Sequence, residues 1–491
     1  MKPRTESTRP LFRVINNVVA FLGGEFVYRL VNFVSGVLVA RSLGGARYGE
    51  FSFIYVYLSF FEIFVQFGMN SILTRRVAQN REGADRILGN ALLLRLILIT
   101  AAIPAAFFLI RGLGYPLSVR QGVGLASLQL FLGIRTIFET IFRVNLLMIY
   151  PALWNGIRSV VNLILVFAVV SFYPSVKLFI LAYLVSGFVG LGGLTLFSAR
   201  FITPRFSIDG RLMKELLQES FPLILSGYLT LLYYRVDVFM LSRMKGFLDV
   251  GYYSVATRLT ESLDVIASSL TLSLFPLLSR SFKEDRSQFQ VLTGKAFYSL
   301  LLLGLPLAIG GSLAARDLIR LFFGVEYLPS GTTLGILFWY TFFGFFSTLL
   351  VNLLIVCGRQ IVDTWVSLFL VIANVAMNLI LIPRFSYNGA AAATVMVEIF
   401  GAGTLLAYLA RHPSIRLRLP VAEWNPLFQA NLLFFVFMMA SKFLLRLPVL
   451  AFVAFGVLVY AALVFAMKLV STSNLKNYFT QGVRAFAGSG E

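Results

Sequence analysis

Apolar runs separated by short polar breaks fill the sequence from residue 14 to residue 470. These runs exceed the roughly 18 residues needed to cross the hydrocarbon core of a bilayer. Because only a helix pairs its own backbone groups in lipid, each run predicts a membrane-spanning α-helix. The pattern predicts fourteen spans, at residues 14–40, 49–73, 87–110, 120–148, 151–173, 177–200, 215–242, 250–278, 291–314, 330–356, 361–382, 389–410, 424–446 and 449–470.

Polar segments arrange these spans as an all-α polytopic membrane protein with two six-helix lobes. A stretch with the helix breakers Pro204 and Gly210 separates the first six spans from the next six. We predict four regions: an N-terminal lobe at 1–200, a cytoplasmic linker at 201–214, a C-terminal lobe at 215–410, and an extra helix pair with a cytoplasmic tail at 411–491.

A sequence repeat indicates that the lobes are related. The stretch from Arg41 to Ser71 recurs 202 residues later, and Glu62, an acid inside an apolar run, corresponds to Asp264. Since six spans precede the second copy, both copies enter the membrane in the same direction. The repeat is therefore parallel, as in transporters built from two homologous halves. The matched positions are Arg41, Gly44, Gly49, Ser52 and Ser71 with Arg243, Gly246, Gly251, Ser254 and Ser273.

Composition and charge exclude other classes of protein. With 58% hydrophobic and 13% charged residues, the chain has too little polar surface for a water-soluble domain. When the N-terminus is placed inside, cytoplasmic segments hold roughly twice as many lysines and arginines as the outer loops. This bias predicts that both termini are cytoplasmic. It also attributes most of the net charge of +20 to anchoring at the inner leaflet, so we expect no nucleic-acid partner.

Ionisable residues inside the predicted spans are the candidate functional groups. A charge near the middle of the membrane costs at least about 2.5–3.5 kcal/mol, so these side chains should face protein or a water-filled cavity. The basic residues are Arg29, Arg95, Arg135, Arg143, Arg158, Arg235 and Arg258, and the acids are Glu25, Glu62, Glu139, Asp237, Glu261, Asp264 and Glu398.

Helical spacing places several of these residues on common faces. There are three such sets: Glu25–Arg29–Asn32 in the first span, Arg135–Glu139–Arg143 in the fourth and Arg258–Glu261–Asp264 in the eighth. An alternative interpretation is that these charges only neutralise one another as ion pairs within one helix. This alternative stays open above all for the set in the fourth span.

Arginines prevail in the first half and acids in the second. We hypothesise that the first half holds an anionic head group and that acids of the second half bind a coupling cation. Neutralising Arg29 or Arg95 should then abolish substrate binding, whereas Asp264→Asn should spare binding and change the ion dependence.

The sequence lacks several chemical motifs. It contains no phosphate-binding loop of the G-x-x-x-x-G-K-[ST] type, so we expect no ATP site, and proton or sodium coupling stays open. A single cysteine and a single histidine, Cys357 and His412, argue against a metal site. No grouping of nucleophile, base and orienting residue stands out, so we expect a protein that is not an enzyme.

Residues 44–51 (GGARYGEF), 234–241 (YRVDVFML) and 250–259 (VGYYSVATRL) carry a family resemblance that extends over essentially the whole chain. The sequence resembles the polysaccharide-export flippases of the multidrug, oligosaccharidyl-lipid and polysaccharide (MOP) exporter superfamily. The resemblance implies that a polyprenyl-diphosphate-linked oligosaccharide moves from the inner to the outer leaflet by alternating access, for cell-surface polysaccharide biosynthesis. It implies residence in the inner (cytoplasmic) membrane, among membrane lipids, with a glycan polymerase and chain-length proteins as further partners.

The resemblance also implies a substrate site. Cavity arginines in such flippases are thought to hold the diphosphate, and Arg29, Arg235 and Arg258 match them by position. The wider candidate set for substrate adds Glu25, Asn32, Arg95, Arg135 and Arg143, and the candidates for ion coupling are Glu62, Asp237, Glu261 and Asp264.

Other functions remain as alternatives. The extra helix pair is also typical of lipid II flippases, in which the last two helices form a groove for the lipid tail. A cation-coupled drug exporter of the same superfamily would need an acidic or apolar cavity, which the arginines of the first half argue against. A glycan polymerase or ligase would present a large outer loop, and all outer loops here are short. A scaffold would not need so many buried charges.

Overall fold

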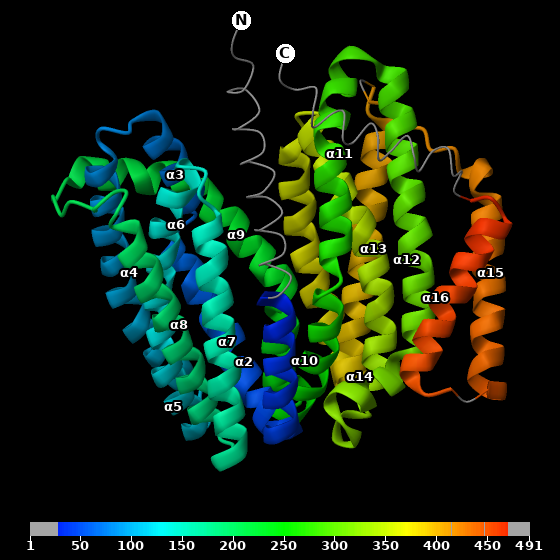
Figure 1. The fold of residues 1–491 in the computed structure, drawn as a ribbon, viewed down its shortest axis with the longest axis horizontal. Coiled ribbons are helices and arrows are strands. Elements are labelled where there is room, and N and C mark those ends of the chain that lie inside the picture. Colours follow the sequence, from blue (N-terminus) through cyan, green and yellow to red (C-terminus); the bar gives the residue numbers. More distant parts are fainter. Residues whose placement is uncertain (1–27, 414, 446, 470–491) are drawn as a thin grey trace, which may run out of the picture. The chain divides into compact units, whose positions relative to one another are not determined.

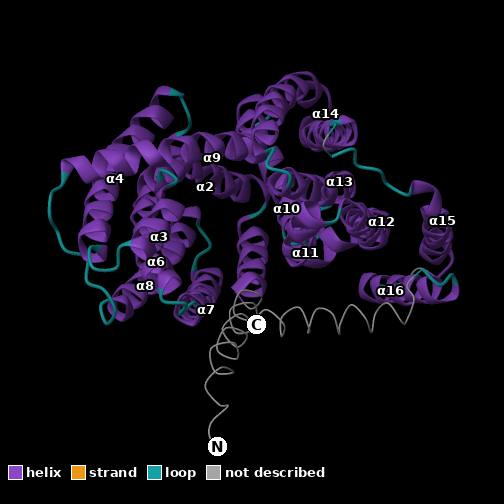
Figure 2. Ribbon diagram, turned by 90° about the horizontal axis from the view of Figure 1, so that it is seen from above, coloured by secondary structure: helices purple, strands orange, loops and turns teal. Residues whose placement is uncertain are grey.

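The computed structural model describes residues 28–413, 415–445 and 447–469, and these residues form helices joined by short turns (Figure 1). Figure 2 shows no strand in this part of the chain. Within it, twelve segments are long and apolar enough to cross a membrane. The predicted all-α polytopic class is confirmed, whereas the total of fourteen spans stays a prediction because the first one begins outside the described residues.

The chain divides into two compact units. The first runs to Arg258 and also takes in Val371–Ala390, and the second holds Leu259–Leu370 and the chain from Ala391 onward. The boundaries of these units differ from those of the predicted lobes at 1–200 and 215–410. The boundaries of the lobes therefore stay a prediction.

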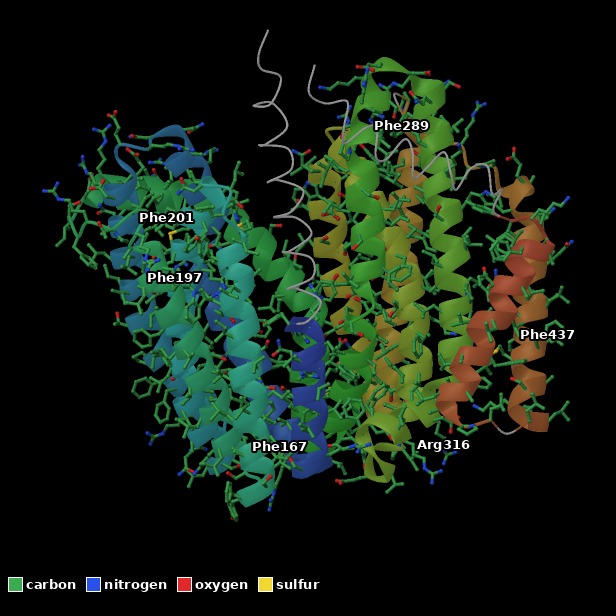
Figure 3. All side chains as sticks on the ribbon, in the orientation of Figure 1. Phe167, Phe197, Phe201, Phe289, Arg316 and Phe437 are labelled. Carbon is green, nitrogen blue, oxygen red and sulfur yellow. The ribbon has the colours of Figure 1, made fainter. Side chains whose placement is uncertain are left out.

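The helices of the first unit pack around buried apolar side chains of α3, α4, α6, α8 and α9. Figure 3 shows Phe197 of α8 and Phe201 near the same end of this unit. Its elements are the helix 28–43, α2 (Gly45–Gln66), α3 (Met69–Gln79), α4 (Ala84–Gly112), α5 (Leu117–Ala126), η1 (Ser127–Ile134), α6 (Arg135–Val144), α7 (Ile149–Phe172), α8 (Val176–Ser198), α9 (Gly210–Met244) and α10 (Phe247–Glu261) up to Arg258.

The second unit is built around α11, α12 and α13, and α15 and α16 pack on α12 beside each other (Figure 1). Its elements are α11 (Asp264–Glu284), α12 (Arg286–Phe323), η2 (Val325–Tyr327), α13 (Ser330–Val356), the outer parts of α14 (Gln360–Arg411), η3 (Val421–Trp424), α15 (Asn425–Ala440), η4 (Ser441–Leu445) and α16 (Val449–Ala466).

Left-handed backbone angles interrupt the helices at two places. The predicted span 49–73 is two helices, because Phe67 and Gly68 adopt left-handed backbone angles (φ 49° and 67°) between α2 and α3. The predicted boundary between spans 361–382 and 389–410 agrees with the structure, because α14 consists of two helices that meet at Ser386, where the backbone is not helical (φ 50°, ψ −132°). A Cβ on Gly389 would lie 2.3 Å from the carbonyl oxygen of Leu381, and this close approach shows that the chain turns back there.

The two copies of the sequence repeat contact each other at equivalent glycines. A Cβ on Gly49 of α2 would lie 1.7 Å from the carbonyl oxygen of Phe247, and a Cβ on Gly251 of α10 would lie 2.0 Å from that of Gly45. Each residue of one pair is 202 positions from its counterpart, so the contact is reciprocal, as a two-fold relation between copies requires. The repeated glycines therefore let two backbones touch.

The predicted linker 201–214 lies against the start of α4. The backbone N–H of Arg205 donates to the carbonyl oxygen of Asp85 at 2.9 Å. The side chain of Asp209 accepts a hydrogen bond from the N–H of Leu212 in the first turn of α9, and it forms an ion pair of 2.6 Å with Arg86. These two contacts hold the pKa of Asp209 below its ordinary value.

Candidate functional site

Arg258 of α10 lies across the helix 28–43 at a glycine. Its Nη2 donates a hydrogen bond of 2.7 Å to the carbonyl oxygen of Asn32. One turn further along, a Cβ on Gly36 would lie 2.0 Å from the Cζ atom of Arg258. The position of this guanidinium therefore depends on the absence of a side chain at Gly36. Asn32, predicted as a cavity residue, contributes its backbone to the contact, and its amide donates to Tyr28.

Two tyrosines connect Arg258 to a second arginine, Arg158 of α7. Tyr183 of α8 interacts with Arg258, and its ring centroid lies 5.8 Å from that of Tyr55 of α2. Arg158 interacts electrostatically with Tyr55 and with Glu62. These five residues, Tyr55, Glu62, Arg158, Tyr183 and Arg258, are named the arginine–tyrosine cluster. Guanidinium and phenol groups together supply the hydrogen-bond donors that a phosphate needs.

A chain of hydrogen bonds leads from Glu62 to Arg95. Gln66 donates to Glu62 at 3.0 Å, and Asn70 donates to Gln66 at 3.4 Å. Arg95 of α4 in turn donates to the side chain of Asn70 at 3.4 Å. The predicted substrate residue Arg95 and the predicted ion-coupling residue Glu62 thus belong to one network.

Arg95 is fully buried (0% exposed) and is directed to backbone oxygens. It donates to the carbonyl oxygens of Gly133 at 2.7 Å and Gln66 at 3.1 Å, and to the hydroxyl of Thr136. Gln66 is the last residue of α2, where carbonyl groups lose their helical partners. This arginine therefore closes the end of α2 and fastens it to η1.

Asp237 of α9 lies in a buried polar network with α10 and α14. It is 1% exposed and accepts hydrogen bonds from the hydroxyl of Tyr253 at 2.7 Å and the amide of Asn378 at 2.6 Å. Asn378 also donates to the side-chain oxygen of Asn374 at 2.8 Å. The side-chain oxygen of Asn378 is buried and has no hydrogen-bond partner. The carboxylate thus accepts one hydrogen bond from an amide N–H and one from a hydroxyl. Carboxylate, hydroxyl and amide oxygens are ligand types that suit a small hard cation.

Sequence reasoning missed the two asparagines beside Asp237. They are four residues apart within the apolar span 361–382, and both are fully buried. That spacing puts two amides on one helix face, which is the same signal that singled out the arginine sets. Arg158 was recognised as a charge within a span, and only the structure brings it into the arginine–tyrosine cluster.

The other predicted substrate residues have varied surroundings. Arg135 forms an ion pair of 2.6 Å with Glu139, four residues along α6, and both side chains are largely buried. This geometry supports the neutralising interpretation for that pair, while Arg143 is exposed at the end of the helix. Arg29 is exposed and Arg235 is half-buried. Glu25 lies outside the described residues.

The predicted common face of Arg258, Glu261 and Asp264 crosses an interruption of the helix and stays a prediction. α10 ends at Glu261 and α11 begins at Asp264, with a turn between them. Backbone bonds from Leu263 to Thr260 and from Ile266 to Leu263 reach back only three residues, so the i→i−4 pattern is interrupted. Glu261 and Asp264 are exposed residues of the second unit.

An apolar groove lies in the second unit. It has a volume of about 540 Å³ and is lined by α12, by Phe338 of α13, and by residues of α15 and α16, among them Phe434 and Gly456. Pro306 and Gly310 line it on α12, where an unbroken row of large side chains would fill the space. The predicted C-terminal helix pair therefore forms one wall of this apolar groove.

Comparison with known proteins identifies the family. Residues 14–282, more than half of the chain, match the family model described as polysaccharide biosynthesis protein, and residues 222–380 match the MatE model. The chain is 24% identical to the capsular polysaccharide biosynthesis protein CapF of Staphylococcus aureus over 320 residues, 64% of this chain and 79% of that protein. It is 23% identical to the probable low-salt glycan biosynthesis flippase Agl15 of Haloferax volcanii over 462 residues, 91% of this chain and 94% of that protein.

Solved structures show the same fold. The lipid II flippase MurJ in an inward closed conformation matches with a TM-score of 0.78 and 16% identity, covering 92% of this chain and 99% of that chain. An inward-facing multidrug resistance MATE transporter of the MOP superfamily matches with a TM-score of 0.63 and 19% identity, covering 78% and 93%. With twelve membrane-length segments in its described part, the chain is thus a multi-pass membrane protein. The family match and the flippase relative support the expectation of a transporter rather than an enzyme. The predicted resemblance is confirmed: this chain belongs to the polysaccharide biosynthesis protein family of the MOP exporter superfamily.

Proposed function

We propose that this protein flips a polyprenyl-diphosphate-linked oligosaccharide from the inner to the outer leaflet of the cytoplasmic membrane by alternating access. The apolar groove beside α15 and α16 is the observation that carries this proposal. A long isoprenoid tail needs continuous apolar surface during transfer, whereas a small water-soluble drug does not. The tail would lie along Pro306, Gly310 and Phe338 of this groove.

The diphosphate would be held by the arginine–tyrosine cluster. Moving an unpaired ion into hydrocarbon costs tens of kcal/mol by Born solvation, on the order of 20 kcal/mol for one charge. Arginine offers planar forks that match phosphate oxygens in pairs, so Arg258 and Arg158 can replace the lost hydration. Arg29, Arg235 and Arg143 stay in the proposed set of ligands. Arg95 and Arg135 leave it, because Arg95 is fully buried and donates to four protein oxygens and Arg135 is neutralised by its ion pair with Glu139.

Coupling of transport to a cation would act through Asp237. The carboxylate would take up a proton, or it would bind sodium together with the hydroxyl oxygen of Tyr253 and the side-chain oxygen of Asn378. Glu62, Glu261 and Asp264 stay as further candidates. A membrane potential with the cytoplasm negative also favours export, by about 2.3 kcal/mol per negative charge per 100 mV. We propose no ATP site and no resident metal cofactor.

Asp237→Asn is expected to preserve the fold and remove ion dependence. The new side chain keeps an oxygen that accepts from the amide of Asn378, and its own N–H can donate to the hydroxyl of Tyr253, so both contacts of this position are retained. The measurement is the flipping rate in proteoliposomes with imposed sodium or pH gradients. Asp249→Asn, which removes a carboxylate bound to Ser386, is the matched control and should keep the gradient response. A response of Asp237→Asn equal to that of the wild type would contradict this role.

A lipid II flippase is the second candidate function. The likeness to MurJ, which covers 99% of that chain, favours it over a drug exporter. Both candidate substrates share the lipid tail and the diphosphate and differ in the group that the diphosphate carries. A glycan polymerase and chain-length proteins are the proposed partners for the first function, and both termini would lie in the cytoplasm.

The deciding experiment compares substrates in proteoliposomes of the wild-type protein. A fluorescent polyprenyl-diphosphate oligosaccharide is expected to move between leaflets, and its accessible fraction is measured by quenching with an impermeant reductant. Lipid II labelled in the same way should move more slowly. Faster movement of lipid II would establish the second candidate instead. Movement of neither lipid, with a soluble organic cation transported, would overturn both.

A further inference from the structure

A second pocket of the second unit has a chemistry different from that of the groove. Its volume is about 740 Å³, and it lies between the end of α12, the start of α13 and η4. Binding pockets for small molecules are typically about 300–1,000 Å³. Its polar and aromatic lining consists of Ser312, Arg316, Thr332, Trp339 and Lys442. None of these residues belongs to the predicted site.

Glycines of α13 form the floor of this pocket. A Cβ on Gly331 would lie 2.9 Å from the Cα atom of Arg316, and the hydroxyl of Ser312 donates to the carbonyl oxygen of Gly335 at 2.8 Å. The two glycines are four residues apart on α13, and Ser312 and Arg316 are four residues apart on α12. The backbones of the two helices therefore touch along one face of each helix. Side chains that would fill the space are missing, and Arg316 is exposed beside it (Figure 3).

The charges at the pocket are mainly positive. Arg316 and Lys442 both line it. Lys442 donates to the carbonyl oxygen of Leu313 and lies 3.9 Å from Asp317, a half-exposed acid whose attraction water weakens. Lys442 belongs to η4, a π-helical turn, and such turns occur frequently at functional sites. The first turn of α13, with its positive helix end, also borders the pocket.

Trp339 supplies a flat apolar surface next to these cations. Its ring packs edge-on against Phe342 with centroids 5.9 Å apart, so its orientation is held by the core. The combination of an aromatic face, hydroxyl groups and two cations matches a sugar that carries an acid. The ring C–H face of a pyranose packs on an indole, the hydroxyls bond Ser312 and Thr332, and the oxyanion meets Arg316 and Lys442.

We propose that this pocket binds an anionic sugar, that is, a pyranose bearing a carboxylate or a phosphate. The inference rests on the proposed function, because such a group would belong to the flipped glycan lipid. With the predicted orientation, the end of α12 and the turn after η4 lie on the outer side of the membrane. The pocket would therefore receive the acidic part of the substrate after its transfer. The acid can be a sugar carboxylate of the glycan or the phosphate of the lipid carrier.

Fluorine NMR on the full-length protein tests this directly. The chain has four tryptophans, so labelling with 5-fluorotryptophan gives four signals, and Trp339→Phe assigns the one at the pocket. Glucuronate is expected to shift the Trp339 signal with saturation, while glucose at the same concentration leaves it in place. Arg316→Gln and Lys442→Gln should each weaken glucuronate binding by about tenfold or more, because each removes a charge-assisted hydrogen bond.

Arg320→Gln is the matched control, since it removes the same charge one helical turn from Arg316 and does not line the pocket. An equal shift with glucose, no shift with any probe, or an equal loss in Arg320→Gln would overturn the proposal. A comparison of glucuronate with glucose 1-phosphate assigns the source of the acid, as the tighter ligand indicates a carboxylate or a phosphate. A wild-type protein that flips its lipid while Trp339 does not respond refutes this site alone. Absence of flipping refutes the proposed function instead.

Discussion

Arg258→Ala is expected to slow flipping of the polyprenyl-diphosphate oligosaccharide by about a hundredfold or more. The guanidinium is the proposed phosphate ligand of the arginine–tyrosine cluster, and it lies against the helix 28–43 through its bond to Asn32. Two charge-assisted hydrogen bonds of about 1.5–3 kcal/mol each would be lost from the transferred diphosphate. The measurement is the initial rate in proteoliposomes, normalised to folded protein. Arg258→Lys should retain part of the rate, because it keeps the charge and loses the fork.

Gly36→Ala tests whether the position of the Arg258 guanidinium matters, because this variant keeps the arginine and moves its side chain. A methyl group there would displace the Arg258 guanidinium, whose flexible end can move without disturbing the backbone. Flipping should fall while the melting temperature stays near that of the wild type. Gly156→Ala on α7, where a Cβ meets nothing within 4 Å, is the control and should flip normally. Normal flipping by both Gly36→Ala and Arg258→Ala would exclude Arg258 as a ligand.

Arg95→Met is expected to destabilise the protein by about 3–5 kcal/mol, the usual cost of removing one partner from a buried charged network. The arginine is fully buried and holds the last carbonyl of α2 and that of Gly133, so its loss leaves polar groups without their partner. Thermal unfolding in detergent, followed by tryptophan fluorescence, measures the change. Arg111→Met, on the exposed end of the same helix, should have little effect.

A measurement of substrate affinity distinguishes a structural role of Arg95 from a role in binding the substrate. The fraction of Arg95→Met that remains folded should bind the lipid diphosphate with a Kd within about twofold of the wild type, since the guanidinium faces protein groups. Loss of binding without loss of stability would restore the sequence-based hypothesis that this arginine holds the substrate.

Residue types and their spacing predicted much of this architecture. Apolar runs marked the helices because burial in lipid leaves little alternative, and the repeat around Gly49 and Gly251 predicted related halves. That pattern had a physical cause, since these glycines let the two copies touch. The break at Phe67 was not predictable, because a single left-handed residue inside an apolar run leaves the hydrophobic pattern unchanged. The break at Ser386, by contrast, lies in the polar segment between two predicted spans.

For the charged residues, too, the sequence determined one part of the answer and the tertiary structure another. The sequence by itself determined that ionisable groups must be sheltered within the membrane, because their cost in lipid is set by chemistry alone. Only the tertiary structure decided what each one contacts: backbone carbonyls for Arg95, an ion pair for Arg135, and a tyrosine and an asparagine for Asp237. Such partners come from distant segments, and periodicity along one helix contains no information about which neighbour it meets. A charge within a span thus predicts a need for partners, and packing alone selects them.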